Sequence, residues 1–265
     1  MPVQAALQYM EEHLDEPLDF PSLAKALHYS KYHLLHQFTA AAGQPPHAYF
    51  RRRRLTEAAR LLAETDQPIM QAALCAGYES QQAFSTRFKA MYKCTPAQFR
   101  ARRCFYALQL PMRLDAEPVP LTSPDFAVPA DIPQWMALVR LTVDSFPCLE
   151  ECGYLRKLAG QIAARRALIV RGRQAALGAA VFSADTGAME FFAVHPQYRK
   201  HGIEAQLLAR AAQLCGRPVS VTTFRARDCA DPGYRAALLR LGFAEGELLT
   251  EFGYPTQRMV QAVRV

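Results

Sequence analysis

Apolar and polar positions alternate at helical spacing through the first hundred residues. The stretches SLAKAL (22–27) and IMQAALCA (69–76) each predict a short apolar helix, followed by a tight turn and a second helix. Between these pairs, residues 46–64 have apolar side chains at a spacing typical of one long amphipathic helix, at Tyr49, Leu55, Ala58, Ala59 and Leu62. The pattern predicts two helix pairs joined by a long helix.

The two helix pairs are copies of one sequence. A shift of 50 positions aligns residues 28–54 with residues 78–103, matching Ser30 with Ser80, Phe38 with Phe88, Pro46 with Pro96, and Arg52–Arg53 with Arg102–Arg103. Serine is favoured at a helix N-cap and proline at the first helical position. We therefore expect the second helix of each pair to follow the serine, and the next helix to begin at the proline.

After residue 105 the pattern changes. Prolines crowd the stretch that follows, at Pro111, Pro118, Pro120, Pro124, Pro129 and Pro133, which are too many for a helix interior. We place a linker at 108–124, between a first domain at 1–107 and a second at 125–265. In the second domain, strands first form hairpins and later alternate with helices, and a single strand closes the chain at 251–263. This order predicts a mixed α/β domain, so the fold class is a multidomain protein with an all-α part followed by an α/β part.

Composition narrows the function classes. The formal net charge of +7 matters only where the positive residues are concentrated. Seven cysteines are scattered along the chain without a pair at a zinc-ligand spacing, which is typical of reduced thiols in a cytoplasmic protein without a metal site. The acidic, amphipathic N-terminus differs from a signal peptide, and no apolar run approaches the ~20 residues needed to cross a bilayer. We expect a cytoplasmic protein with no membrane partner.

The second helix pair has the chemistry of a DNA reader. Residues 80–103 hold no acid and six cations, Arg87, Lys89, Lys93, Arg100, Arg102 and Arg103. Phe84 and Phe88, one helical turn apart, should face the core and leave Gln81 and Gln82 outside. A glutamine amide donates to and accepts from the adenine edge at once, and cations attract phosphates. A glutamine pair alone is often only solvated surface, but the repetition of the basic clusters in both copies favours double-stranded DNA binding.

Residues 8–103 resemble the AraC/XylS-type DNA-binding domain, in the subgroup of the MarA, SoxS and Rob regulators. The pattern is carried by Gly77, Tyr78, Ser80, Phe84, Phe88, Lys89, Thr95, Pro96, Phe99 and Arg100. The resemblance implies base contacts by Tyr32, His36, Gln81, Gln82 and Thr86. The full set of DNA-binding candidates adds Lys31, Ser85, Arg87, Lys89, Arg52, Arg53, Arg102 and Arg103. The subgroup usually has Arg at positions 36 and 86, so the target sequence should differ from that of the relatives.

In the second domain, a strand ending at Val194 runs through a loop with Arg199, Lys200 and Gly202 into a helix. Exposed amides at a helix start, with a glycine and cations, are typical of a pyrophosphate cradle. Residues 125–262 resemble the GNAT acyltransferase fold through V.P.YR..GI...LL and LLRLGF. The resemblance implies acetyl-CoA bound by Phe192, Ala193, Val194, Arg199, Lys200, His201, Gly202, Ile203 and Glu204, with Glu190 as a catalytic base.

Two positions depart from the GNAT pattern and leave three functions open. Glu204 stands where the family has Gly or Ala, and Leu238 stands where many members have a proton-donating Tyr. The first hypothesis is a transcriptional regulator whose second domain senses a small-molecule effector or acetyl-CoA, with RNA polymerase as a possible further partner. The second adds an active N-acetyltransferase with an amine substrate, and the third reduces the domain to an inert dimerisation module.

Overall fold

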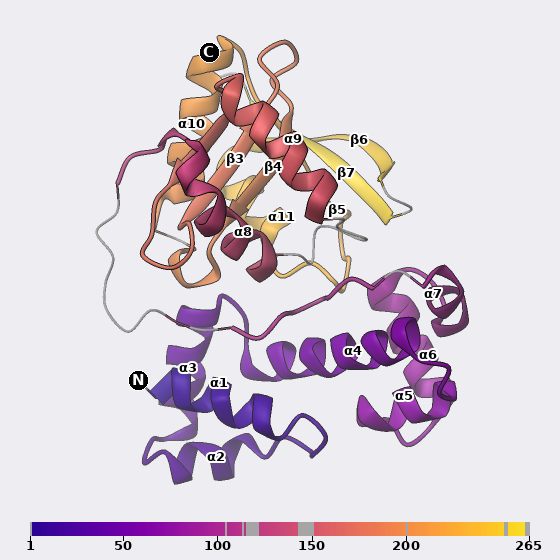
Figure 1. Cartoon of the computed structure of the whole chain (residues 1–265). Coiled ribbons are helices and arrows are strands. Elements are labelled where there is room, and N and C mark those ends of the chain that lie inside the picture. The colour runs from indigo at the N-terminus through magenta and orange to yellow at the C-terminus, as the bar shows by residue number, and fades with distance from the viewer. Residues whose placement is uncertain are drawn as a thin grey trace. The chain divides into compact units, whose positions relative to one another are not determined.

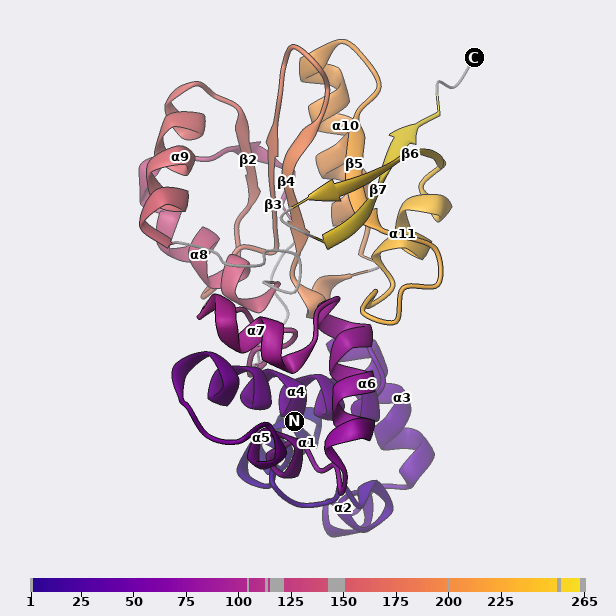
Figure 2. The same ribbon diagram turned by 90° about the vertical axis from the view of Figure 1, so that its right-hand side faces the viewer.

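In the computed structural model, residues 2–103, 105–112, 114, 122–142, 151–199, 201–251 and 254–262 are described. They form two compact units, which are drawn in Figures 1 and 2. Unit 1 contains the described residues up to 114, and unit 2 contains those from 122 onward. Among the described residues, no helix is long and apolar enough to span a membrane.

Unit 1 is helical throughout its described part. Its elements are α1 (Pro2–Glu12), α2 (Phe20–Ala26), α3 (Lys31–Ala42), α4 (Pro46–Glu64), α5 (Ile69–Cys75), α6 (Gln81–Tyr92) and α7 (Pro96–Arg102). The predicted helix pairs are α2–α3 and α5–α6, and the predicted long helix over 46–64 is α4. The prediction of an all-α double helix-turn-helix region is therefore confirmed.

The predicted helix starts are confirmed by their caps. The Oγ of Ser30 accepts a hydrogen bond from the amide of His33, and the Oγ of Ser80 accepts one from the amide of Ala83, both at 3.2 Å. α4 begins at Pro46 and α7 at Pro96. Each serine cap satisfies an amide that the helix itself leaves free, which fixes where α3 and α6, the second helix of each pair and the predicted recognition helix, begin.

The turns of the two helix pairs differ by one residue. α2 ends at its C-cap Leu27 and is followed by His28 in the left-handed region, whereas α5 ends at its C-cap Ala76 and is followed by Gly77 in the same region. Glu79 is the extra residue of the second turn. The constant shift of 50 is therefore wrong upstream of the serines, where the shift is 49.

Helix α4 is the scaffold of unit 1. The apolar positions predicted for it, Tyr49, Leu55, Ala58, Ala59 and Leu62, have no exposed surface. Its first turns pack in the core of the first copy, where the rings of Tyr49 and Phe38 meet at 5.8 Å. Further along, α4 packs against α5 and α7 of the second copy. One helix thus supplies the core of both copies.

After α7 the chain runs back along α4 (Figure 1). Tyr106, Leu108, Gln109 and Met112 of this segment are buried, and several of its backbone groups bond to side chains of α4. Residues 105–112 and 114, hereafter the strap, therefore belong to unit 1, although the sequence pattern assigned residues 108–124 to a linker. Of the rest of the predicted linker, residues 113 and 115–121 lie outside the described residues, and residues 122–124 belong to unit 2.

Unit 2 is a mixed α/β fold, as predicted. Its elements are β1 (Asp125–Phe126), η1 (Pro129–Asp131), α8 (Ile132–Leu141), α9 (Glu151–Ala163), β2 (Ala167–Val170), β3 (Gly178–Phe182), β4 (Met189–Val194), η3 (Pro196–Tyr198), α10 (Ile203–Cys215), β5 (Ser220–Phe224), α11 (Tyr234–Arg240), β6 (Phe243–Glu251) and β7 (Tyr254–Gln261). The strands form two antiparallel sheets, ordered β1-β2-β3-β4 and β5-β7-β6.

The two sheets meet where β4 and β5 form their facing edges. An isolated parallel bridge, Ala188–Ser220, joins them at one end. Beyond it, no strand of the described residues pairs with the β5 side of β4. A further difference from prediction lies in the second sheet, where the closing element is a hairpin of β6 and β7 instead of one strand.

Candidate nucleic-acid interface and candidate cofactor loop

The two predicted recognition helices present the same pattern of exposed positions. In both, the first three residues are exposed, the fourth is buried, and the sixth is exposed before a second buried residue. The buried pairs are Leu34 and Phe38 in α3 and Phe84 and Phe88 in α6, all without exposed surface. The apolar pair anchors each helix and turns its first turn outward, as the repeat predicted.

The predicted base-reading residues lie on these outward faces. Lys31, Tyr32 and His36 of α3 are exposed, as are Gln81, Gln82, Thr86 and Lys89 of α6, while Ser85 and Arg87 are half-buried. Tyr32 has 79% of its surface exposed, so its ring is accessible to a nucleic-acid ligand. Equivalent positions 31 and 81, 32 and 82, and 36 and 86 thus present matched sets of side chains.

Both recognition helices lie on one side of α4. Figure 1 shows α3 and α6 toward opposite ends of α4, and Figure 2, which looks along α4, shows both on the same side of it. The 19 residues of α4 give it a length of roughly 28 Å. Successive major grooves on one face of B-DNA are about 34 Å apart, so an α4 scaffold has the right scale for two grooves.

Two of the predicted phosphate contacts lie at the end of α7. Arg102 and Arg103 are exposed. Arg103 also forms an ion pair with the carboxylate of Asp66 and donates to the carbonyl of Thr65 at 3.4 Å. Arg102 is the freer of the two for an external anion, because no ion pair with it is found in the described part of the chain.

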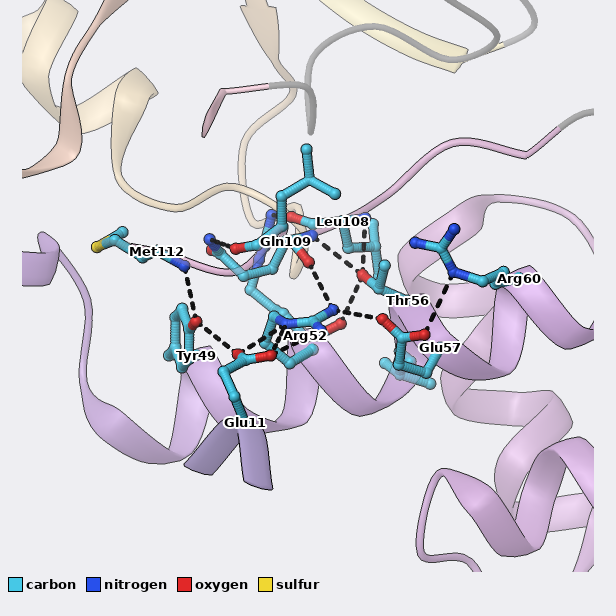
Figure 3. A network of polar contacts seen from close by, with 12 residues as sticks. Glu11, Tyr49, Arg52, Thr56, Glu57, Arg60, Leu108, Gln109 and Met112 are labelled. Carbon is cyan, nitrogen blue, oxygen red and sulfur yellow. Dashed lines mark hydrogen bonds and ion pairs between the residues drawn. The ribbon is translucent and has the colours of Figure 1, made fainter. Parts of the chain in front are cut away.

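The other two predicted phosphate contacts, Arg52 and Arg53, are buried and paired inside unit 1, which corrects that prediction. They are only 4% and 3% exposed. Arg52 donates to the Leu108 carbonyl at 2.9 Å (Figure 3). Arg53 forms an ion pair with Glu11 at 2.8 Å. The equivalent arginines of the second copy stay in solvent because α7 ends there, whereas α4 continues to Glu64 and is covered by the strap.

Two exposed residues at this surface, His33 and Ala83, were not among the predicted contacts. His33 lies between Tyr32 and the buried Leu34, and its ring stacks on that of Tyr29 with centroids 5.4 Å apart. The repeat could have indicated His33, because it is the third residue of α3 and both neighbouring first-turn positions were predicted to face outward.

In unit 2, the candidate cofactor loop leads into α10. Gly202 is the N-cap of α10 in the left-handed region (φ 82°), without a side chain capping the first amides, and open space surrounds the place of a Cβ. His201 and Gly202 are exposed and Ile203 is buried. Uncapped amides and open space fit a phosphate group. The half-buried Glu204 in the first turn does not add to this fit, and Lys200 lies outside the described residues.

Arg199 is engaged elsewhere in this fold. Its Nη2 donates to the hydroxyl of Tyr234 in α11 at 2.6 Å, and its guanidinium lies 4.5 Å from the centre of that ring. Its Nε is buried and has no hydrogen-bond partner among the described residues. Because the Nη2 bond and the ring contact both involve Tyr234, a pyrophosphate would compete with Tyr234 for the Arg199 guanidinium.

The predicted catalytic base is also paired. Glu190 is exposed on β4 and accepts a hydrogen bond from the amide of Gln161 in α9 at 2.9 Å. Phe192 of the same strand is half-buried and packs against the core cluster that includes α10 residues, while Ala193 and Val194 are buried. Leu238, at the position of the family's proton donor, is 4% exposed and apolar. No group of three metal-ligating side chains is found within the described ranges.

Comparison with known proteins identifies the family to which the first unit is similar. A family model described as a helix-turn-helix domain matches residues 23–102. A solved AraC-type DNA-binding regulator from Chromobacterium violaceum is 31% identical with a TM-score of 0.36, covering 38% of this chain and 92% of that chain. The Regulatory protein SoxS of Escherichia coli K12 is 38% identical over 100 residues, which cover 38% of this chain and 94% of SoxS. The chain belongs to the AraC family.

This AraC-family protein is accordingly a DNA-binding transcriptional regulator, as the resemblance of residues 8–103 predicted. The chain is also similar in part to a GNAT-family acetyltransferase structure from Bacillus cereus. That structure is 13% identical with a TM-score of 0.41, covering 52% of this chain and 94% of that chain.

Proposed function

We propose that the regulator binds double-stranded DNA through both copies of its helix-turn-helix unit, with α3 and α6 in successive major grooves. The matched exposure of the two helices on one side of α4 carries this proposal. In α6, Gln81 and Gln82 would read adenine edges, and in α3, Tyr32 and His36 would read the other groove. Arg102 would hold a phosphate and set the register without reading sequence.

A test starts from a duplex selected from a random pool by the full chain. Gln82→Ala should relax base preference at one position, with a loss of discrimination of about 1–3 kcal/mol, or roughly 5- to 150-fold. Gln8→Ala is the matched control, since Gln8 is an exposed glutamine of α1 that bonds to Glu12. An unchanged preference in Gln82→Ala would show that α6 does not read bases through this side chain.

The phosphate contact has a different signature. Arg102→Ala should weaken binding to all duplexes alike and reduce the slope of log affinity against log salt concentration by about one. Arg60→Ala is the control because Arg60 is paired with Glu57 and Glu64 on the same helix. A slope that falls equally in both variants would contradict a direct contact by Arg102.

For unit 2, we infer an effector domain that takes up an acyl-CoA-like molecule or another small phosphate-bearing ligand. Support comes from the open, uncapped start of α10 at Gly202 and from the β5-facing edge of β4, which lacks a strand partner in the described chain. Backbone groups left free at a sheet edge need partners, and an extended ligand with amides could supply them. Efficient catalysis is less well supported, because Glu190 is paired and Leu238 cannot donate a proton.

Titration calorimetry with acetyl-CoA tests the sensor. A thiol-release assay over a panel of amines then separates sensor from enzyme. Binding without thiol release supports the sensor, and thiol release supports the acetyltransferase. Absence of binding would exclude both for this cofactor, and sedimentation of the full chain would then test the dimerisation alternative.

A further inference from the structure

The strap is bonded to α4 through its own backbone (Figure 3). The amides of Leu108 and Gln109 both donate to the Oγ1 of Thr56 at 3.1 Å. In return, Arg52 donates to the carbonyl of Leu108 at 2.9 Å, and Arg53 donates to the carbonyl of Gln109 at 3.2 Å. These α4 side chains are buried, so α4 provides a row of buried hydrogen-bond donors and acceptors for the backbone of the strap, which has no regular secondary structure.

The strap also contacts both copies of the helix-turn-helix unit. At one end, the ring of Tyr106 packs on Tyr92 of α6 at 5.2 Å and on Phe99 of α7 at 5.4 Å. At the other end, the amide of Met112 donates to the Tyr49 hydroxyl at 3.1 Å, and the Met112 side chain is part of the first copy's core. The strap therefore connects the two copies along a path separate from α4 itself.

Side chains tie the middle of the strap to the first copy. The side-chain Nε2 of Gln44, in the turn between α3 and α4, donates to the Oε1 of Gln109 at 2.6 Å, and both residues are buried. The amide of Leu114 donates to the Oε1 of Gln4 in α1 at 3.0 Å. A segment so fully bonded cannot shift along α4 without leaving buried polar groups unpaired.

We propose that the strap is a positioning element that fixes the orientation of one helix-turn-helix copy relative to the other, so that α3 and α6 bind one duplex together. This role rests on the proposed two-groove binding. When the copies are held in register, binding of the second copy follows binding of the first at a high effective concentration. A loosened strap lowers that concentration without altering either reading surface.

Thr56→Val is the test because it keeps the shape of the side chain and removes the acceptor of two strap amides. Thr65→Val is its matched control. The Thr65 hydroxyl donates to the carbonyl of Leu61 at 2.7 Å, four residues back, as Thr56 does to Arg52 at 2.8 Å, and it accepts from no strap amide. Gln109→Ala is a second variant that keeps both bonds to Thr56.

Affinities are measured by fluorescence anisotropy for the full chain on three duplexes. One is the duplex selected from the random pool, and in each of the others the base pairs protected by one copy are scrambled. Thr56→Val and Gln109→Ala should bind the intact duplex about tenfold more weakly and the scrambled ones within about twofold of wild type. Thr65→Val should match wild type on all three.

The outcomes separate the strap from the proposed function. Equal losses on all three duplexes would mean that Thr56→Val and Gln109→Ala merely lower the folded fraction, and no loss on any duplex would mean that the strap does not position the copies. Either result overturns the inference. If wild type binds the intact duplex no more tightly than a scrambled one, the proposed two-groove binding is itself refuted, independently of the strap.

Discussion

Glu11 neutralises the buried guanidinium of Arg53, so its replacement tests how unit 1 is held together. The carboxylate accepts hydrogen bonds from Arg53 at 2.8, 2.9 and 3.1 Å and one from the Tyr49 hydroxyl at 2.8 Å. Removing one partner of a fully buried pair costs about 3–5 kcal/mol. Glu11 is 22% exposed and Arg53 keeps Glu57 at 2.8 Å, so we expect Glu11→Ala to cost about 2–3 kcal/mol.

The assay is urea unfolding of the full chain followed by two signals. Helical circular dichroism is weighted toward unit 1, while the fluorescence of Trp135, the single tryptophan, reports unit 2. With a urea dependence of about 2 kcal/mol/M, Glu11→Ala should lower the unit 1 midpoint by about 1 M or more. Glu11→Gln should fall between wild type and Glu11→Ala, because the amide keeps an acceptor and loses the charge.

Glu12→Ala is the control. Glu12 is exposed on the same helix and accepts one bond, from Gln8 at 2.9 Å, so its loss should cost less than about 0.5 kcal/mol. If Glu11→Ala and Glu12→Ala shifted the dichroism midpoint by the same amount, the buried pair would contribute nothing particular to unit 1. The reasoning from burial and pairing would then be refuted.

Further predictions concern a turn of unit 1 and an ion pair of unit 2. Gly77→Ala and Gly202→Ala should each cost about 1–2 kcal/mol by thermal unfolding, because both glycines have a positive φ (78° and 82°) that a residue with a Cβ rarely adopts. At Gly77 an added Cβ would also displace the Arg54 guanidinium, but this group is the far end of a flexible side chain and adds little to the cost. Burial tends to raise the pKa of Asp131, but hydrogen bonds from Arg171 and a backbone amide outweigh it and hold the pKa below 3.8. The pair therefore stabilises unit 2 above about pH 4 and is lost as pH falls through the folded pKa, so the stability difference between wild type and Asp131→Asn, read by tryptophan fluorescence, should be about 1 kcal/mol at pH 7 and shrink at pH 3.

Local signals in the sequence predicted much of unit 1. The serine caps and the prolines act on neighbouring amides, and the spacing of apolar residues in α4 is a property of one helix, so the bounds 46–64 agree with the structure. The outward faces of α3 and α6 followed from the same spacing. The repeat could not reveal the shorter first turn. The left-handed position of the turn is occupied by Gly77 in the second copy but by His28 in the first, so no glycine marks it there.

The remaining differences come from contacts between distant residues. Burial of Arg52 and Arg53 depends on a segment that returns more than 50 positions later, which no local pattern contains. The pairing of Arg199 with Tyr234 is of the same kind. β6 was missed because it is an edge strand with exposed residues on both faces, so its sequence lacks the alternation by which strands are recognised.

The sharing of α4 has a consequence for how unit 1 folds. Tyr49 and Phe50 complete the core of one copy, while later residues of the same helix pack against α5 and α7 of the other. A state with one copy melted would leave half of α4 with apolar side chains in water and no partner. Duplicated halves of this kind are expected to melt in a single cooperative step, so neither half has a stability of its own to lose.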